Sequence, residues 1–280
     1  MRKLWKLAAL VAAAALTACA PVAQRSAAAG SEDCDKDALA TLYPGIFTFG
    51  TDQPVYPPWY MGDNPANGEG FESALAYAVA GKLNYSRDDV RWVWVPFNAA
   101  LAPGPKGFDA NLSEFSITDQ RRAAVDFSSP YFDVTQAVVT VKTSPAAGAK
   151  SLEALKSLRL GAQVGTTSHS AAAALDGSVP VEVYNTNGDA KMALSTGEID
   201  ALVADLPTAF AVANELRDGT MVGQFPSGSE EVEQFGIVLD KGSPLTRCVS
   251  WVVDGLREDG TLAQLEQQWL ANAGKAPMLT

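Results

Sequence analysis

Several short groups of polar and aromatic residues, each close to the end of an apolar run, have the composition of a ligand site. They are found in the segments "TDQPVYPPWY" with Asp52 and Tyr56, "SEFSITDQR" with Ser113, Glu114, Ser116 and Arg121, "GTTS" with Thr166 and Thr167, and "VADLPTA" with Asp205. Open α/β sheets bind ligands at the carboxyl ends of their strands, where these groups are expected. An arginine can hold a carboxylate through two parallel hydrogen bonds. With Asp205 as acceptor for an ammonium group and aromatic walls nearby, the set predicts a site for an α-amino acid.

Two adjacent arginines, Arg121 and Arg122, stand just after Thr118, Asp119 and Gln120, where a helix is expected to begin. The first turn of a helix carries partial positive charge, so an arginine there is unfavourable unless it has another partner. We assign that role to Arg121. Arg122 is expected in solvent, because adjacent helical residues do not share a face.

Segments typical of strands alternate with segments typical of helices along the chain. Strands are expected at residues 45–52, 90–97, 108–115, 159–165, 179–185 and 199–205, and helices at 71–83, from 118, and at 151–158, 166–175, 189–197 and 206–216. The run at 90–97 is expected to be a strand buried on both faces. Two helices broken at Asp259-Gly260 are expected to follow. This alternation predicts an α/β fold with mainly parallel sheets.

Two Pro/Gly-rich breaks, at residues 141–150 and 223–236, divide the chain into two α/β lobes that it crosses between twice. The predicted boundaries are 36–141 for the first part of lobe 1, 142–228 for lobe 2, and 229–280 for the returning part of lobe 1.

The first 19 residues have the pattern of an export signal. Arg2, Lys3 and Lys6 precede an apolar run that ends in "LTAC". This run is too short to span a membrane. "LTAC" resembles the bacterial lipobox, which predicts lipidation of Cys19; an ordinary signal peptide is the alternative. Residues 20–35 are small and polar, as in a flexible tether. Without the three cations, 18 basic residues face 32 acidic ones, a net charge of −14 that disfavours nucleic acid and anionic bilayers.

Two cysteines remain in the exported part, Cys34 and Cys248. An even pair in an oxidising compartment favours a disulfide, and two unpaired buried thiols are the alternative.

No common catalytic or metal motif is present. The chain contains no G-x-S-x-G, P-loop, H-E-x-x-H or G-x-G-x-x-G sequence. The single histidine, His169, has no His, Cys or carboxylate cluster beside it in the sequence, so we expect it in solvent in the first turn of a helix. No catalytic residue, cofactor or metal site is predicted.

The chain resembles the bacterial extracellular solute-binding proteins of family 3, the polar amino-acid receptors of ABC importers. The resemblance runs from about Cys34 to Leu270 and depends on "GTD…YPPW", "GFESALAYAVAGKL", "FDANLSEFSITDQRRAAVDFSSPYF", "AQVGTTS", "GEIDALVADLPTA", "EQFGIVLDKGSPL" and "DGTLAQLEQQWL". It implies a type II periplasmic binding protein fold, with two α/β lobes joined by two hinge strands. Ligand binds between the lobes, which close over it.

The resemblance also implies a role for each candidate residue. Arg121 holds the ligand carboxylate, to which Thr166 and Thr167 donate from the second lobe, and Asp205 receives the α-ammonium group. The remaining ligand contacts implied are Ser113, Ser116, Tyr56, Phe97 and Asp52.

Glu114 departs from the family pattern, which usually has Gly, Ser or Gln there. If Glu114 faces the cleft, the acids Asp52, Glu114 and Asp205 oppose Arg121 and favour a cationic ligand. A Glu114 turned to solvent, or bonded to a local backbone N–H, is the alternative. An extra residue between Asp52 and Tyr56 leaves the reach of Asp52 open, and Trp59 either lines the cleft or covers a lobe.

These features predict a lipid-anchored, monomeric extracytoplasmic receptor that delivers an amino acid to a permease and ATPase on separate chains. A second hypothesis is that the protein is a dehydratase acting on arogenate or prephenate, a reaction that relatives with this fold catalyse. Glu114 would then serve as the general acid. A third is a ligand-sensing partner of a signalling protein.

Overall fold

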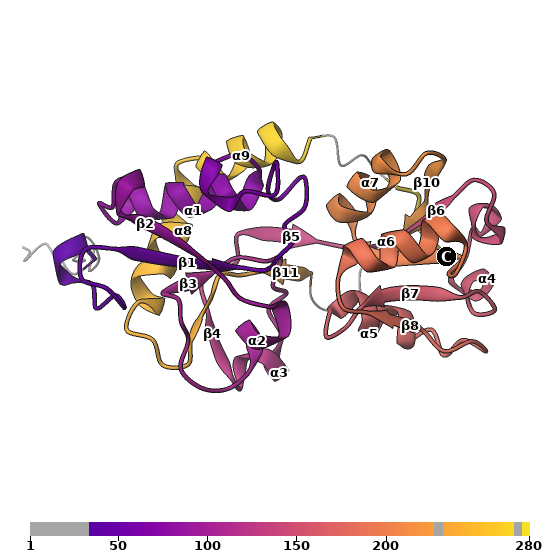
Figure 1. The fold of residues 1–280 in the computed structure, drawn as a ribbon, viewed down its shortest axis with the longest axis horizontal. Helices are drawn as coiled ribbons and strands as arrows, with labels where there is room; N and C mark the ends of the chain where they lie inside the picture. The colour runs from indigo at the N-terminus through magenta and orange to yellow at the C-terminus, as the bar shows by residue number, and fades with distance from the viewer. Residues whose placement is uncertain (1–33, 227–231, 272–275) are drawn as a thin grey trace, which may run out of the picture.

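Two lobes, each built on a five-stranded sheet, lie side by side in the computed structural model, which describes residues 34–226, 232–271 and 276–280 (Figure 1). The lobe 1 sheet has the order β2-β1-β3-β12-β4, and the lobe 2 sheet has the order β10-β6-β9-β7-β8. Both sheets are mixed, since β1 pairs parallel with β2 and β3 while β12 is antiparallel, and β6 is antiparallel to its neighbours.

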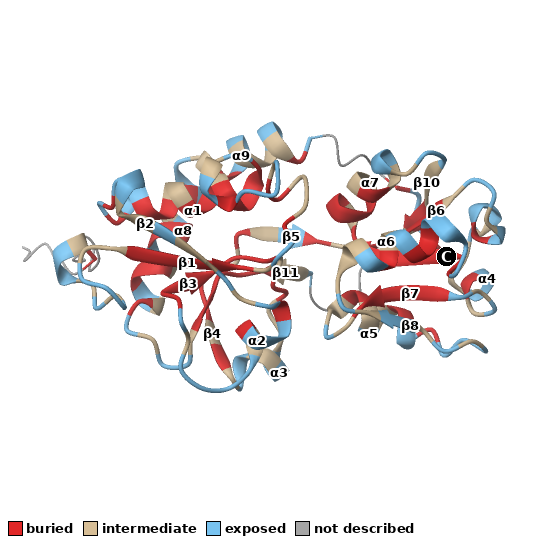
Figure 2. Ribbon diagram, in the orientation of Figure 1, coloured by how far each residue is buried: buried red, intermediate tan, exposed pale blue. Residues whose placement is uncertain are grey.

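Helices cover the sheet of lobe 1. α1, α8 and α9 pack against one another on one side, over a core that includes Phe47, Phe49, Leu75 and Val249 (Figures 1 and 2). The elements of lobe 1 are β1 (Phe47–Thr51), α1 (Phe71–Lys82), β2 (Val90–Trp94), α2 (Phe97–Leu101), β3 (Ala110–Asn111), α3 (Asp119–Arg122), β4 (Val125–Phe127), β12 (Val238–Asp240), α8 (Thr246–Glu258) and α9 (Thr261–Trp269), with 3-10 turns at Lys36–Ala38, Pro65–Asn67 and Arg87–Asp89.

Four side chains start the helices of lobe 2. Ser151, Thr166, Thr186 and Asp205 each accept a hydrogen bond from the backbone N–H three residues further on, which satisfies a donor that the helix leaves free. The elements are β6 (Gln136–Val141), a 3-10 turn (Pro145–Gly148), α4 (Leu152–Leu155), β7 (Leu160–Gln163), α5 (Thr167–Ala173), β8 (Glu182–Tyr184), α6 (Asn187–Thr196), β9 (Ala201–Asp205), α7 (Leu206–Glu215) and β10 (Gly219–Gln224).

A short antiparallel ribbon of β5 (Phe132–Val134) and β11 (Glu233–Phe235) connects the lobes. The two-lobe fold with two hinge strands is confirmed. The chain passes from lobe 1 into lobe 2 after β5 and returns at β11. It enters lobe 2 again at its end, because Leu279 lies in the lobe 2 core and Met278 pairs with Gln224 (Figure 1).

Several details of the prediction differ from the structure, and both sheets are mixed rather than mainly parallel. β6 belongs to the lobe 2 sheet, so the lobes divide before Gln136 rather than at Val141, and residues 276–280 pack on lobe 2 rather than lobe 1. The break at 141–150 is a loop within lobe 2. β2 is an edge strand, not a strand buried on both faces, and its Trp94 remains 46% exposed. A continuous apolar run does not distinguish an edge strand from a central one.

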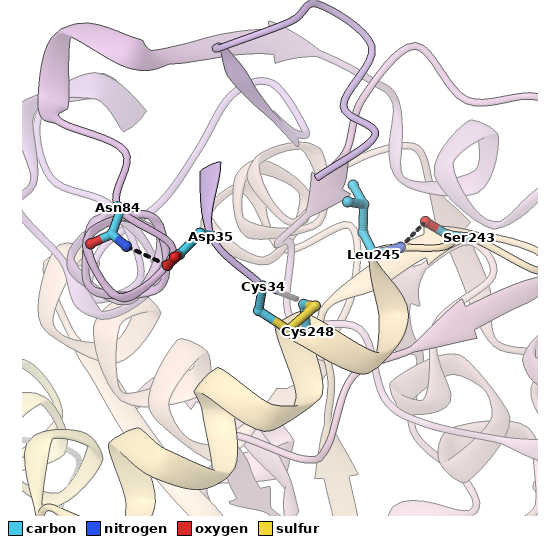
Figure 3. Close-up of a disulfide and its surroundings, with 6 residues drawn as sticks. All are labelled: Cys34, Asp35, Asn84, Ser243, Leu245 and Cys248. Atoms are coloured by element: carbon cyan, nitrogen blue, oxygen red, sulfur yellow. Dashed lines mark hydrogen bonds between the residues drawn. A yellow bond between two sulfur atoms is a disulfide. The ribbon is translucent and has the colours of Figure 1, made fainter. Parts of the chain in front are cut away.

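A disulfide joins Cys34 to Cys248 on α8, so it fastens the start of the described chain onto lobe 1 (Figure 3). Asp35, the next residue, accepts a hydrogen bond of 2.6 Å from the side-chain amide of Asn84. Both cysteines are buried in the lobe 1 core. Cys19 lies outside the described residues.

Candidate ligand-binding cleft

A pocket between the lobes gathers all ten of the predicted ligand contacts. Asp52, Tyr56, Phe97, Ser113, Glu114, Ser116 and Arg121 line it from lobe 1, and Thr166, Thr167 and Asp205 line it from lobe 2. The space open to the centre of a water molecule is about 50 Å³. Since one water needs roughly 10–15 Å³ on this measure, the closed pocket has room for about three to five waters, the scale of one small solute.

Arg121 lies at the contact between the lobes. Its Nη1 donates to the carbonyl of Ser116 at 2.6 Å, and its Nη2 donates across the cleft to the carbonyl of Gly165 at 3.0 Å. The guanidinium carbon lies 5.5 Å from the centre of the Phe97 ring. Burial lowers the pKa of Arg121 to about 10, so the side chain remains a cation at neutral pH.

The lobe 2 wall opposite Arg121 is the start of α5. The hydroxyl of Thr166 accepts from the N–H of His169 at 3.1 Å and donates to the carbonyl of Gln163 at 2.8 Å. Thr167 and Ser116, from opposite lobes, hydrogen-bond through their hydroxyls at 3.0 Å. Thr166 therefore has a structural role at the helix start, while the Thr167 hydroxyl faces lobe 1.

Asp205 ends β9 and begins α7. Its Oδ1 accepts from the backbone N–H of Thr208 at 2.9 Å. Burial raises the pKa of Asp205 to about 6, because a desolvated carboxylate is less favourable than the neutral acid. Asp205 has no cationic partner among the contacts of the described residues, so its remaining lone pairs are suited to an ammonium group.

Glu114 faces the cleft, against the alternative that places it in solvent or on a local backbone N–H. Its Oε2 accepts from the hydroxyl of Thr208 in lobe 2 at 3.2 Å. Its backbone is left-handed, with φ of 55°. Burial, followed by the negative charges of Asp205 and Glu72, raises the pKa of Glu114 well above its usual range. Asp52 also lines the pocket, and burial raises its pKa.

The aromatic residues divide between the cleft and the core. The Tyr56 hydroxyl accepts from the backbone N–H of Gly188 in lobe 2 at 3.0 Å. Trp59 is completely buried in lobe 1, packs edge-on against Phe71, Phe132 and Phe235, and donates its indole N–H to Thr208 at 2.8 Å. Trp59 thus covers lobe 1 and contacts lobe 2, but it does not line the pocket.

Several polar residues of the cleft were not predicted from the sequence. Gln136, Gln163, Ser168 and Asn187 line the pocket, and the Glu233 carboxylate accepts from Ser116 at 2.6 Å. Gln136 is the first residue of β6, Gln163 is the last residue of β7, and Glu233 lies on the hinge ribbon. Their positions depend on strand pairing between distant segments, so local pattern carried little signal for them.

Within the described ranges, no cluster of three or more His, Cys, Asp or Glu side chains is arranged to hold a metal ion. His169 lies in the first turn of α5, as expected, and lines a separate hollow of lobe 2 with Lys156, Asp176 and apolar neighbours. No helix in the part of the chain described here is long and apolar enough to cross a membrane.

Comparison with known proteins agrees with this architecture. Residues 47–272 match the family described as "Bacterial extracellular solute-binding proteins, family 3". The chain belongs to this family. It is 28% identical to the L-arginine-binding protein of Pseudomonas aeruginosa over 84% of this chain and 94% of that one. It is 26% identical to the ABC transporter glutamine-binding protein GlnH of Bacillus subtilis over 96% of this chain and 98% of that one.

Among solved structures, an ancestral arginine-binding protein bound to arginine is similar, with a TM-score of 0.68 and 31% identity. The match covers 80% of this chain and 98% of that one. The similarity therefore spans both lobes and is not confined to one of them.

Proposed function

We propose that this protein is the extracytoplasmic receptor of an ABC importer and that it binds one α-amino acid in the cleft between its lobes. The observation that carries the proposal is the placement of Arg121 and Asp205 on the walls of one closed pocket. One is a cation suited to the α-carboxylate, and the other is an acid suited to the α-ammonium group. The relatives named for arginine and glutamine binding support this substrate class.

Ligand capture follows from the contacts that cross the cleft. Tyr56, Ser116 and Arg121 each bond lobe 2 directly, so the lobes are held closed by hydrogen bonds beside the ligand pocket. A ligand that contacts both walls of the cleft stabilises only this closed form, so it shifts the hinge equilibrium from the open to the closed form. The closed form then docks on a permease, with the ATPase on a further chain.

A dehydratase role is the second candidate, and the buried acid Glu114 is the observation that favours it. The family relatives reported above are described as binding proteins, which supports the receptor. Turnover of arogenate or prephenate by the purified protein would establish the enzyme instead. We also propose that Cys19 is lipidated and anchors the receptor. A Cys19→Ser protein that remains membrane-bound would contradict this.

The experiment that tests the receptor is calorimetry with the common amino acids, on protein that lacks residues 1–19 and has been unfolded and refolded to remove bound ligand. Wild type is expected to bind one chemical group of amino acids with 1:1 stoichiometry. Arg121→Ala is expected to weaken that binding at least 100-fold, because Arg121 is the only cation among the described residues that line the pocket.

The matched control is Arg122→Ala. Arg122 is exposed and packs over Phe127, away from the pocket. The Arg122→Ala variant is expected to bind the amino acid with an affinity within about twofold of wild type. Absence of binding to every amino acid by folded wild type would overturn the receptor proposal.

A further inference from the structure

We propose that Glu72 positions Glu114 as the residue that selects a cationic ligand side chain, and that the same Glu114 carboxyl joins the lobes through Thr208. This inference rests on the proposed function, since it names the ligand class of that cleft. It assigns a role to Glu72, which neither lines the pocket nor belongs to the predicted site.

The backbone at Glu114 requires a restraint. Its φ of 55° lies in the left-handed region, where the Cβ of an ordinary residue crowds the following carbonyl. Glycine adopts this conformation without that crowding. A non-glycine residue held there is typical of a functional position and persists when its surroundings fix it.

Glu72 provides that restraint. It lies in the first turn of α1 and is completely buried. Its Oε1 accepts from the backbone N–H of Glu114 at 2.8 Å and from the hydroxyl of Tyr131. Its other oxygen, Oε2, is buried without a hydrogen-bond partner. Burial of the Glu72 carboxyl group costs free energy. Its hydrogen bond to the Glu114 N–H fixes the peptide that directs the Glu114 side chain into the cleft.

The other end of Glu114 meets lobe 2. Because the Thr208 hydroxyl accepts from Trp59 at 2.8 Å, its single proton is free to be donated to Glu114 Oε2 at 3.2 Å. Trp59 and Glu114 belong to lobe 1 and Thr208 to lobe 2. The three side chains therefore link the two lobes in this closed form.

Among the described residues, no cation forms an ion pair with Glu114. The groups that surround it are acids and phenols from five segments: Glu72 on α1, Asp205 on β9, Asp52 after β1, Tyr60 before α1, and Tyr131 between β4 and β5. Arg121 lines the same pocket, but its guanidinium donates to two backbone carbonyls. Glu233 on β11 adds further negative charge near Asp205 and Arg121.

This arrangement makes cation binding depend on pH. Burial and the neighbouring acids raise the pKa of Glu114, so the cleft favours its neutral form up to a higher pH than an ordinary glutamate would allow. A guanidinium or ammonium side chain favours the carboxylate, and binding then releases the proton to solvent. Affinity for a cationic ligand therefore rises with pH, whereas a neutral side chain gains nothing from this ionisation.

The test measures the ratio of arginine to glutamine affinity between pH 6 and pH 8. Using a ratio cancels effects on the α-carboxylate and α-ammonium contacts, which both ligands share. In wild type the ratio is expected to rise at least tenfold over this range. In Glu114→Gln it is expected to be at least tenfold lower at pH 8 and to rise less with pH than in wild type. The control is Glu69→Gln, which replaces an exposed acid just before α1. Its affinity ratio should match that of wild type at each pH.

Glu72 is tested by two substitutions. Glu72→Gln retains an oxygen for the Glu114 N–H, so selectivity should persist, while removal of the acid shifts the pH profile of the ratio to lower pH. Glu72→Ala removes the support and should lower the ratio as Glu114→Gln does. If Glu72→Ala fails to fold, Glu72→Gln decides alone, and an unshifted profile contradicts the role of Glu72.

The two proposals fail differently. Wild type that binds no amino acid overturns the receptor and this inference together. Wild type that binds amino acids with a pH-independent ratio, or with a ratio that Glu114→Gln leaves unchanged, overturns only the inference.

Discussion

Asp205 combines two residue-scale roles that one substitution can separate. Its side chain caps α7, and we propose that its carboxylate also receives the ammonium group of the ligand. Asn is as good an N-cap as Asp, so Asp205→Asn should keep the helix and the unfolding temperature within a few degrees of wild type. Losing a charged hydrogen bond worth about 1.5–3 kcal/mol should weaken amino-acid binding roughly 10- to 150-fold. Calorimetry and thermal unfolding of the same samples measure the two effects.

The pH dependence of the same residue supplies an internal check. The raised pKa of about 6 means that Asp205 becomes protonated as the pH falls through that value. Because the ammonium group needs the carboxylate, wild-type affinity for glutamine should fall below pH 6, while Asp205→Asn should show no such fall. An affinity in Asp205→Asn within threefold of wild type at pH 7.5 would leave Asp205 with a capping role only.

The roles of individual cleft residues were largely predictable where a local sequence motif indicated them. Thr166 and Asp205 each stand between a strand and a helix, and Arg121 lies in the short helix that Thr118 caps, so the sequence around each of them is informative. Glu72 was not predictable, because an acid in the first turn of a helix is already explained by the helix dipole. Only the tertiary fold brings its carboxylate beneath the Glu114 peptide.

At the scale of elements, α6 approaches Tyr56 of lobe 1 closely at Gly188. Gly188 lies in the first turn of α6, and a Cβ built there would meet the Tyr56 hydroxyl at 2.4 Å. Gly188→Ala should therefore obstruct closure and weaken ligand binding at least tenfold, without loss of fold stability. Gly81→Ala on α1, where a Cβ meets nothing within 4 Å, is the matched control. Titration calorimetry compares the two.

The same clash can be relieved to test its origin. Tyr56→Phe removes the oxygen and leaves the ring carbon that would be 3.3 Å from the new Cβ. Gly188→Ala should then cost less affinity in the Tyr56→Phe background than in wild type. An equal cost in both backgrounds would show that closure does not depend on this contact.

Helices with a strong periodicity of apolar residues were predicted well, whereas short strands were predicted poorly. α1 and the break between α8 and α9 at Asp259-Gly260 were confirmed. β5 and β11, three residues each, and the place of β6 in lobe 2 depend on pairing between residues far apart in sequence. Such pairing leaves no local periodicity, so the lobe boundary at Val141 was placed too late.

At the scale of the whole molecule, the disulfide acts on lobe 1 and not on the hinge. It closes a loop across 214 residues, yet both of its cysteines lie in the lobe 1 core, away from the pocket. In the chain-entropy account, such a long loop stabilises the folded state by about 5 kcal/mol, because the cross-link limits the unfolded chain. Cys34→Ser/Cys248→Ser should therefore lose up to about 5 kcal/mol of unfolding free energy, measured by urea denaturation.

Ligand affinity should not follow that loss. The closing contacts of Tyr56, Arg121 and Thr208 involve neither cysteine, so the folded double variant should bind within twofold of wild type. Reductant should destabilise wild type and leave the double variant unaffected, which separates the bond from the serine substitutions. A large loss of affinity in the folded double variant would instead mean that anchoring the start of the chain on α8 helps to set the position of the lobes.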